Sequence, residues 1–156
     1  MSVSPHDRPL VIPIIPDRLL ALTYPDTTVH HFALELDRGT MDIWANRLAN
    51  KSSFRRKLLA YSAAREQRRF ADAWSCKSLR VLTVTTSEQR IEHMLAAQRR
   101  AVPQCPAGFF LYATLARIGE HGALGPAWTT IKGGQLSMRH NMSGFSERAA
   151  PEILQG

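Results

Sequence analysis

Three carboxylates in the first quarter of the chain are the residues best suited to chemistry. Glu35 and Asp37 stand two positions apart, so both side chains would leave the same face of a strand. Asp17 lies in an earlier segment and comes within reach of both if the two segments pair as a hairpin. Carboxylates this close repel one another unless a cation or a proton intervenes. The trio therefore predicts a site for Mg²⁺, which can activate water against a phosphodiester bond.

The same spacing also fits a simpler arrangement. Glu35 and Asp37 would then lie on a solvated sheet face and pair with Arg38 or with the basic helix that follows. The residues favour neither arrangement over the other.

The elements that position these residues begin with a predicted hairpin. Residues 17–24 and 29–37 are two strand-like segments, and Pro25-Asp26-Thr27-Thr28 between them is typical of a turn. A turn there places Asp17 opposite Leu36, diagonal to Glu35 and Asp37. The apolar side chains of the second strand fall on the face opposite the two acids; these are Phe32, Leu34 and Leu36.

Helices and strands alternate after the hairpin. We expect a short helical piece near 41–49, helices over 54–73 and 88–100, and strands over 79–85 and 109–115. Phe54, Leu58 and Tyr61 give the first long helix a buried stripe, and Lys57 lies one turn before Tyr61. This order predicts an α/β fold with a mixed central sheet, an initial hairpin and helical crossovers.

Positive charge is concentrated in one part of the chain. The net charge is +7, and residues 47–69 hold eight basic side chains and one acidic one, while the remainder carries twelve of each sign. Such a segment is typical of a surface that binds DNA, although a merely solvated basic face has the same composition. The candidate contacts to the DNA backbone are Arg55, Arg56, Arg65, Arg68 and Arg69, and Lys57 is a candidate to neutralise a phosphate.

Length and composition exclude several classes of protein. With 156 residues and 44% apolar content, the chain is the size of one globular domain, and it has no apolar run of the roughly 20 residues that a membrane span needs. Cys76 and Cys105 are too few for a disulfide framework and are expected as buried thiols. We expect a cytoplasmic protein with a lead-in over 1–14, a domain over 15–131 and a weakly ordered tail over 132–156.

Several motifs resemble the replication-relaxation family of plasmids and integrative elements, over roughly residues 14–130. They are Pro16-Asp17, Glu-Leu-Asp-Arg-Gly-Thr at 35–40, Phe54 to Tyr61, Arg80 to Thr85, and Leu124 to Trp128. The resemblance implies a restriction-endonuclease-like core of the PD-(D/E)xK superfamily, with Asp17, Glu35 and Asp37 as catalytic metal ligands. Asp37 occupies the position of the usual lysine, and Lys57 would substitute for it from the helix. Lys57 with Tyr61 is similar to the Gln-xxx-Tyr element of some members.

The resemblance also implies a function. We expect a DNA-associated, nuclease-like domain in the replication or transfer of a plasmid or mobile element, with Mg²⁺-dependent cleavage of phosphodiester bonds. The alternative is a catalytically inactive module of the same family that binds DNA or a replication or transfer protein. The usual N-terminal winged helix is not expected in this chain.

Overall fold

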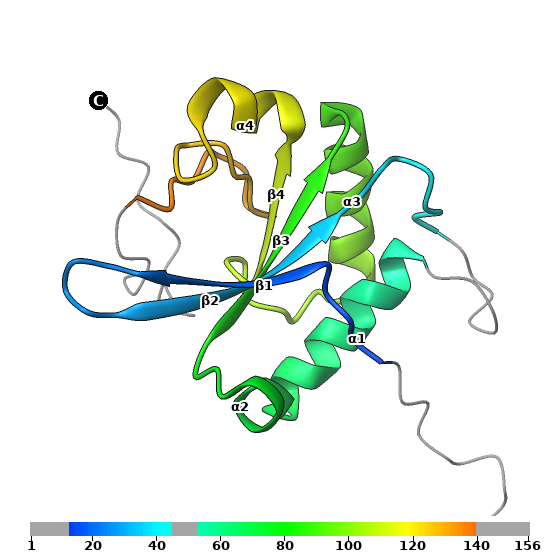
Figure 1. The fold of residues 1–156 in the computed structure, drawn as a ribbon. Helices are drawn as coiled ribbons and strands as arrows, with labels where there is room; N and C mark the ends of the chain where they lie inside the picture. Colours follow the sequence, from blue (N-terminus) through cyan, green and yellow to red (C-terminus); the bar gives the residue numbers. More distant parts are fainter. Residues whose placement is uncertain (1–12, 45–52, 140–156) are drawn as a thin grey trace, which may run out of the picture.

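The fold is a mixed four-stranded sheet with helices, described by a computed structural model for residues 13–44 and 53–139 (Figure 1). The strand order is β1-β2-β3-β4, with β1 and β2 antiparallel and the other pairs parallel. The elements in chain order are β1 (Arg18–Thr23), β2 (Val29–Leu36), α1 (Phe54–Glu66), α2 (Arg69–Trp74), β3 (Leu79–Thr85), α3 (Glu88–Ala101), β4 (Phe110–Thr114) and α4 (Leu115–His121). The predicted α/β class, with an initial hairpin and helical crossovers, is confirmed at this level.

The hairpin turns where the sequence predicts it, but its register is shifted by one residue. The backbone of Tyr24 exchanges hydrogen bonds with Thr27 and Thr28, which closes a tight turn. Arg18 pairs with Leu34, so by the same register Asp17 lies opposite Glu35 and not opposite Leu36. The prediction was wrong by one residue because turn geometry fixes the register of a hairpin.

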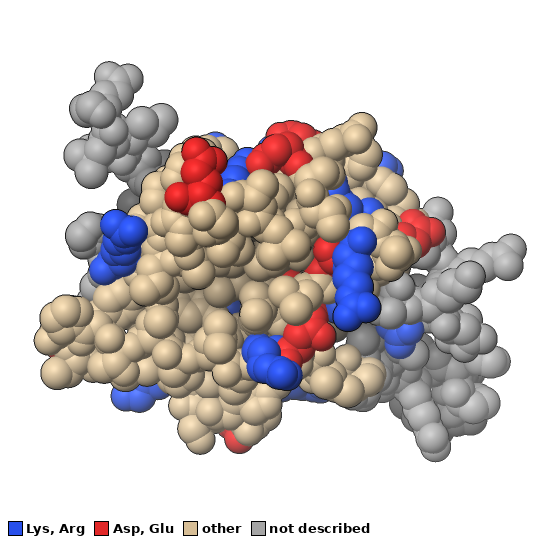
Figure 2. Space-filling view, turned by 45° about the horizontal axis from the view of Figure 1, so that its top comes forward, with Lys and Arg blue, Asp and Glu red and all other residues tan. Residues whose placement is uncertain are grey.

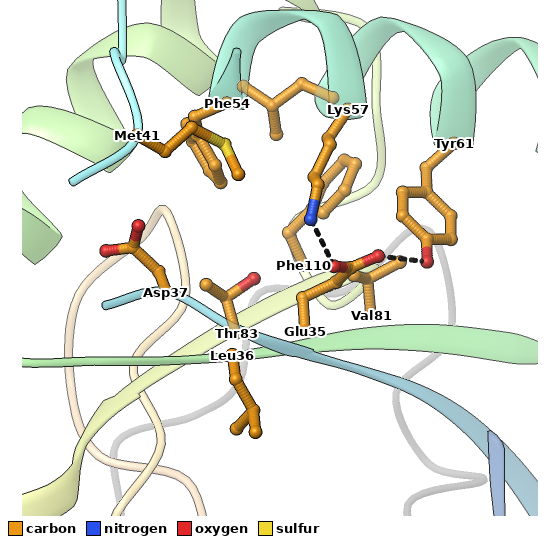
Figure 3. A pocket seen from close by; sticks show the side chains of 11 residues that line it. Glu35, Leu36, Asp37, Met41, Phe54, Lys57, Tyr61, Val81, Thr83 and Phe110 are labelled. Carbon is orange, nitrogen blue, oxygen red and sulfur yellow. Dashed lines mark hydrogen bonds and ion pairs between the residues drawn. The ribbon is translucent and has the colours of Figure 1, made fainter. Parts of the chain in front are cut away.

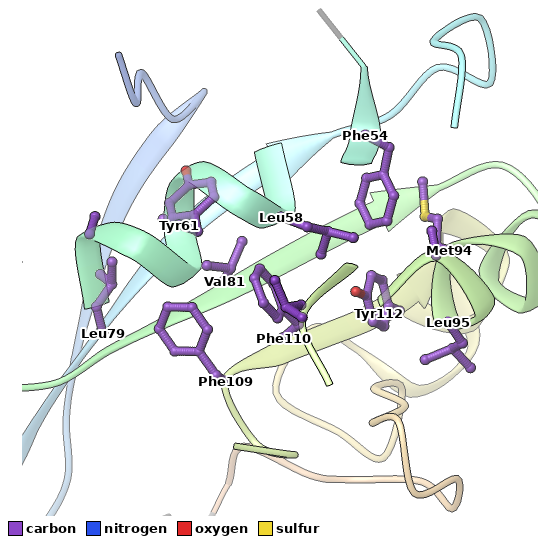
Figure 4. Packing of buried hydrophobic residues seen from close by; sticks show 14 of the residues in the cluster. Phe54, Leu58, Tyr61, Leu79, Val81, Met94, Leu95, Phe109, Phe110 and Tyr112 are labelled. Carbon is purple, nitrogen blue, oxygen red and sulfur yellow. The ribbon is translucent and has the colours of Figure 1, made fainter. Parts of the chain in front are cut away.

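The main core lies between one face of the sheet and helices α1 and α3 (Figure 4). Phe54, Leu58 and Tyr61 of α1 are all buried, which confirms the predicted stripe. The α1 helix begins after Ser53, whose hydroxyl accepts a hydrogen bond from the Arg56 N–H at 3.2 Å. Side chains of this kind satisfy the free amides at helix starts.

The opposite face of the sheet is covered by the segment after α4. Trp128 and Met138 are buried there against Leu82, Val84 and Leu111. The backbones of Tyr112 and Thr129 exchange two hydrogen bonds, which covers the β4 edge at this point. Both faces of β3 and β4 are therefore packed, which explains why every residue of the two strands except Arg80 is buried.

The single helix expected over 54–73 is two helices with a sharp turn between them. Arg68 adopts a left-handed conformation with φ of 54°, between the end of α1 and the start of α2. In one straight helix, Phe70 would lie about 180° around the axis from Tyr61. The turn instead brings Phe70 into the core, where its ring stacks on Trp74 at 5.5 Å between centroids. Burial of Phe70 thus explains why the helix is interrupted at Arg68, although no glycine or proline is present there.

The edge of the sheet at β1 is exposed. Leu19 and Leu20 each keep 42% of their surface accessible. No helix within residues 13–44 and 53–139 is long and apolar enough to cross a lipid bilayer. Most of the helical piece expected near 41–49 lies outside the described residues, as do 1–12 of the lead-in and 140–156 of the C-terminal segment.

Candidate functional site

Glu35 lies on the sheet face that α1 covers, at the end of β2. Its side chain is only 7% exposed. One carboxylate oxygen accepts a hydrogen bond from the Tyr61 hydroxyl at 2.7 Å, and the other contacts the Lys57 ammonium at 2.5 Å (Figure 3). The two donors are one helical turn apart on α1, so a single helix face supplies both. Lys57 thus reaches Glu35, and its positive charge compensates the buried carboxylate.

Tyr61 acts as a donor in this arrangement. Burial first, and then the hydrogen bond to Glu35 and its negative charge, raise the pKa of the Tyr61 phenol above its usual value. The phenol therefore stays protonated throughout the range in which the protein is handled.

Asp37 lies on the same face but has a different set of partners. The Arg90 guanidinium, from α3, donates to both of its oxygens, and the second of these contacts measures 2.9 Å. The Thr85 hydroxyl, from the end of β3, donates to it at 2.7 Å. Burial by itself raises the pKa of Asp37, but the hydrogen bonds and charge of Arg90, with the Thr85 hydroxyl, hold this pKa below its usual value.

Arg90 also fixes the chain that leaves β2. Its guanidinium donates to the Met41 carbonyl at 2.6 Å, while it holds Asp37. Asp42 in turn accepts the first amide of α1, from Phe54, at 3.0 Å through its backbone carbonyl. The ion pair thus connects β2, α3 and the approach to α1.

Asp17 lies opposite Glu35 in the hairpin, and its negative charge contributes to the raised pKa of Tyr61, but it does not form a metal site with Glu35 and Asp37. Its side chain is at the exposed start of β1 and accepts the Leu36 N–H at 2.8 Å. This hydrogen bond from a side chain takes the place of the next backbone hydrogen bond between the two strands. Asp17 therefore holds the start of β1 against the end of β2.

A small cavity lies between the two buried acids. It has a volume of about 20 Å³ and is lined by Glu35, Asp37, Lys57 and Thr83 among others. Such a volume holds one water molecule or one small ion. In Figure 3 the carboxylate of Glu35 points toward Lys57 and Tyr61. The carboxylate of Asp37 points away from Glu35.

The expected meeting of three carboxylates is not found in this structure. Within residues 13–44 and 53–139, no three acidic, histidine or cysteine side chains come together as a metal site. The acids are bound by Lys57, Arg90 and a backbone amide, so in this arrangement they do not fit one shared cation. For Glu35 the alternative of a pair with the basic helix is the one observed, although the Glu35 side chain is buried and that of Lys57 is 30% exposed. Binding of Mg²⁺ stays a prediction.

The five candidate DNA-contacting arginines do not form one face. Arg55 and Arg56 are half-buried near the start of α1, whereas Arg68 and Arg69 are exposed beyond its end. Arg65 is half-buried, with its guanidinium 5.7 Å from the centre of the Phe109 ring. The break after α1 also places Arg68 and Arg69 beyond the helix that carries Lys57.

The sequence analysis missed Arg90 and Thr85 as residues of this site. Thr85 ends a predicted strand next to β2, so the parallel pairing of the two strands could have indicated it. Arg90 lies in the first turn of α3, 53 residues from Asp37, and its role depends on how that helix packs.

The chain matches no protein-family model, no curated protein and no solved structure. The similarity to replication-relaxation proteins therefore stays a prediction that rests on the motifs.

Proposed function

We propose that this protein is a DNA-binding domain of a plasmid or mobile-element replication or transfer system, built on a restriction-endonuclease-like core whose acidic centre is structural. The observation that supports a structural acidic centre is the engagement of Glu35 and Asp37 by donors of the chain itself. Lys57 and Tyr61 hold Glu35, and Arg90 holds Asp37.

The buried acids have a stabilising role in this proposal. A carboxylate removed from water is costly unless it is paired and hydrogen-bonded. Asp37 is 6% exposed, and its partner Arg90 is 15% exposed. A metal ion at Asp37 would have to displace a two-fold hydrogen-bonded guanidinium, which leaves a buried cation without its partner.

Binding to DNA is supported by charge. The net charge of +7 attracts a polyanion over long range, and this attraction weakens as salt is added. A surface that binds phosphates needs no catalytic centre. DNA binding and DNA cleavage can therefore be measured independently.

A salt series tests the binding. We expect the affinity for a fluorescent DNA duplex, measured by anisotropy, to fall steeply with salt and to be unchanged within about twofold by Glu35→Gln, because this substitution changes the net charge by only one, at a buried position. Affinity that is absent in low salt, or independent of salt, would overturn the proposal.

Cleavage by the same centre is the second candidate, and the cavity beside Glu35, Asp37 and Lys57 favours it. A plasmid-nicking assay with Mg²⁺ or Mn²⁺ tests it. Nicking by the wild type that Glu35→Gln and Asp37→Asn both abolish would establish this candidate. Binding without nicking is the result that our first proposal predicts.

A further inference from the structure

A wide groove runs along the end of the sheet that is opposite the acidic centre. It has a volume of about 1,560 Å³, larger than typical small-molecule sites of roughly 300–1,000 Å³. The starts of β2 and β3, the end of α1, the loop before β4 and residues 130–132 form its walls. We call it the basal groove, because it lies where β2 and β3 begin, next to α2.

The charges along the basal groove are almost all positive. Its cationic side chains are Arg65, Arg68, Lys77, Arg80 and Lys132, and the acidic side chain among the residues that line it is Glu66. Arg68, Lys77 and Lys132 are exposed and come from three separate segments of the chain. The fold therefore gathers cations that the sequence analysis did not connect with the basic segment.

The other two cations have positions fixed by the fold. Arg80 contacts the Nδ1 atom of His30 at 3.3 Å, and Arg65 lies over the Phe109 ring. Glu66 is in contact with Gln104, whose amide donates to it at 3.4 Å. A groove with fixed cations in its wall and exposed cations at its rim suits an extended anion.

The face toward the acidic centre differs in its charge pattern. Figure 2, which brings the upper end of the sheet forward, shows basic side chains next to acidic ones across the visible face. Mixed charge of this kind attracts a phosphate chain less than a group of cations alone does. The basal groove is thus the better candidate for a polyanion.

We propose that the basal groove binds the sugar–phosphate backbone of DNA without reading its sequence. This inference rests on the proposed DNA-binding function and names its surface. Five cations line the groove against one acid, and three of them are exposed, so a chain of phosphates can satisfy more of this charge than a single phosphate ion can. Phe70 and Phe109 in the groove are 7% and 4% exposed, so they offer no surface on which bases could stack. Contacts to phosphates alone carry no sequence information.

The groove is also remote from the acidic centre. His30 in the groove and Glu35 are five residues apart on β2, which corresponds to about 17 Å. DNA held in the groove is therefore bound independently of the state of Glu35 and Asp37.

Two matched double variants of the full chain test the location. Lys77→Glu with Lys132→Glu removes two exposed cations from the groove, and Arg38→Glu with Arg139→Glu removes two exposed cations elsewhere. Each substitution changes the charge by two, so both variants carry +3 in place of +7. Any difference in DNA affinity between the two variants therefore comes from where the charges were changed and not from the net charge.

We expect the groove variant to lose about tenfold or more in affinity for a duplex of arbitrary sequence. The slope of its log affinity against log salt concentration should correspond to about two fewer released counterions. The control variant should lose less than about threefold. Equal losses, or a larger loss in the control, would overturn the groove as the binding surface while DNA binding itself stands. No binding by the wild type would instead overturn the proposed function. Circular dichroism verifies the fold, and Lys77→Gln with Lys132→Gln replaces the groove variant if the reversal unfolds it.

Discussion

The Arg90 guanidinium donates to both oxygens of the Asp37 carboxylate and connects the end of β2 to the first turn of α3. The pair is mostly buried, and Arg90 donates to the Met41 carbonyl as well. One ion pair thus fixes the segment that leads toward α1, the helix that supplies Lys57 and Tyr61.

Removal of either partner of this pair should destabilise the protein. We expect Asp37→Ala and Arg90→Met each to lower the free energy of unfolding by about 3 kcal/mol, because each leaves a buried charge without its partner. The double variant should lose clearly less than the sum of the two. Urea unfolding measures all three, with Arg69→Met as an exposed control expected within about 0.5 kcal/mol of the wild type. Additive losses would show that the two residues do not stabilise each other.

The contribution of Asp37 to stability should depend on pH in acid only. Its pKa is lower in the folded protein than the value of about 3.9 in an unfolded chain. The stabilisation is therefore complete above about pH 4 and is lost as the pH falls through the folded pKa. The difference in free energy of unfolding between wild type and Asp37→Asn should be constant from about pH 5 to 7 and shrink below about pH 4. A difference that persists unchanged at the acidic limit would contradict the assignment.

The Tyr61 hydroxyl should contribute more than an ordinary tyrosine hydroxyl. Tyr61→Phe leaves a buried oxygen of Glu35 without its donor, and we expect a loss of about 2 kcal/mol because the acceptor is charged. Tyr24 offers a matched comparison, since its hydroxyl donates to the neutral Met138 carbonyl at 2.9 Å. Tyr24→Phe should cost about 1 kcal/mol in the same urea experiment. The reverse order would contradict a stronger hydrogen bond at Tyr61 than at Tyr24.

Arg68 should tolerate glycine better than valine. Its positive φ costs a non-glycine residue roughly 1–2 kcal/mol. We expect Arg68→Gly to leave the melting temperature unchanged or slightly raised, and Arg68→Val to lower it, because a β-branched side chain is the most strained in this conformation. Thermal unfolding by circular dichroism gives the ranking, and valine at least as stable as glycine would be inconsistent with the turn between α1 and α2.

Cys105 should react slowly although it is partly exposed. Burial, more than any other cause, raises the pKa of its thiol to about 11, so little thiolate forms near neutral pH. Thiolate is the reactive form, and we expect labelling by a disulfide reagent on the order of 100-fold slower than in urea. Cys76→Ser isolates the Cys105 signal. A rate in the folded protein close to the unfolded rate would refute the buried environment.

The strands and the buried helix stripe could be predicted from local patterns. Leu79–Thr85 has the bounds that its alternation and flanking residues predict, and Phe54, Leu58 and Tyr61 are buried as their spacing indicates. Local periodicity determines these features, because each depends on residues within a few positions of one another.

The partners of the acids could not be predicted in the same way. Whether Asp37 meets a metal or Arg90 depends on the packing of α3, and the sequence holds no local trace of this contact. The turn at Arg68 also depends on tertiary packing. Burial of Phe70 in the core outweighs the helical preference of the surrounding residues. The predicted hairpin register was wrong by one residue. The sheet face on which a side chain lies can thus be predicted even where the residue opposite it on the neighbouring strand cannot.

The exposed position of β1 has a consequence for how copies of this protein behave when crowded together. The amides and carbonyls along the outer side of a terminal strand can template another extended chain, and Leu19 and Leu20 add apolar surface on both sides of that ladder. In concentrated preparations, aggregation would start at this strand, through intermolecular pairing that leaves the packed interior intact.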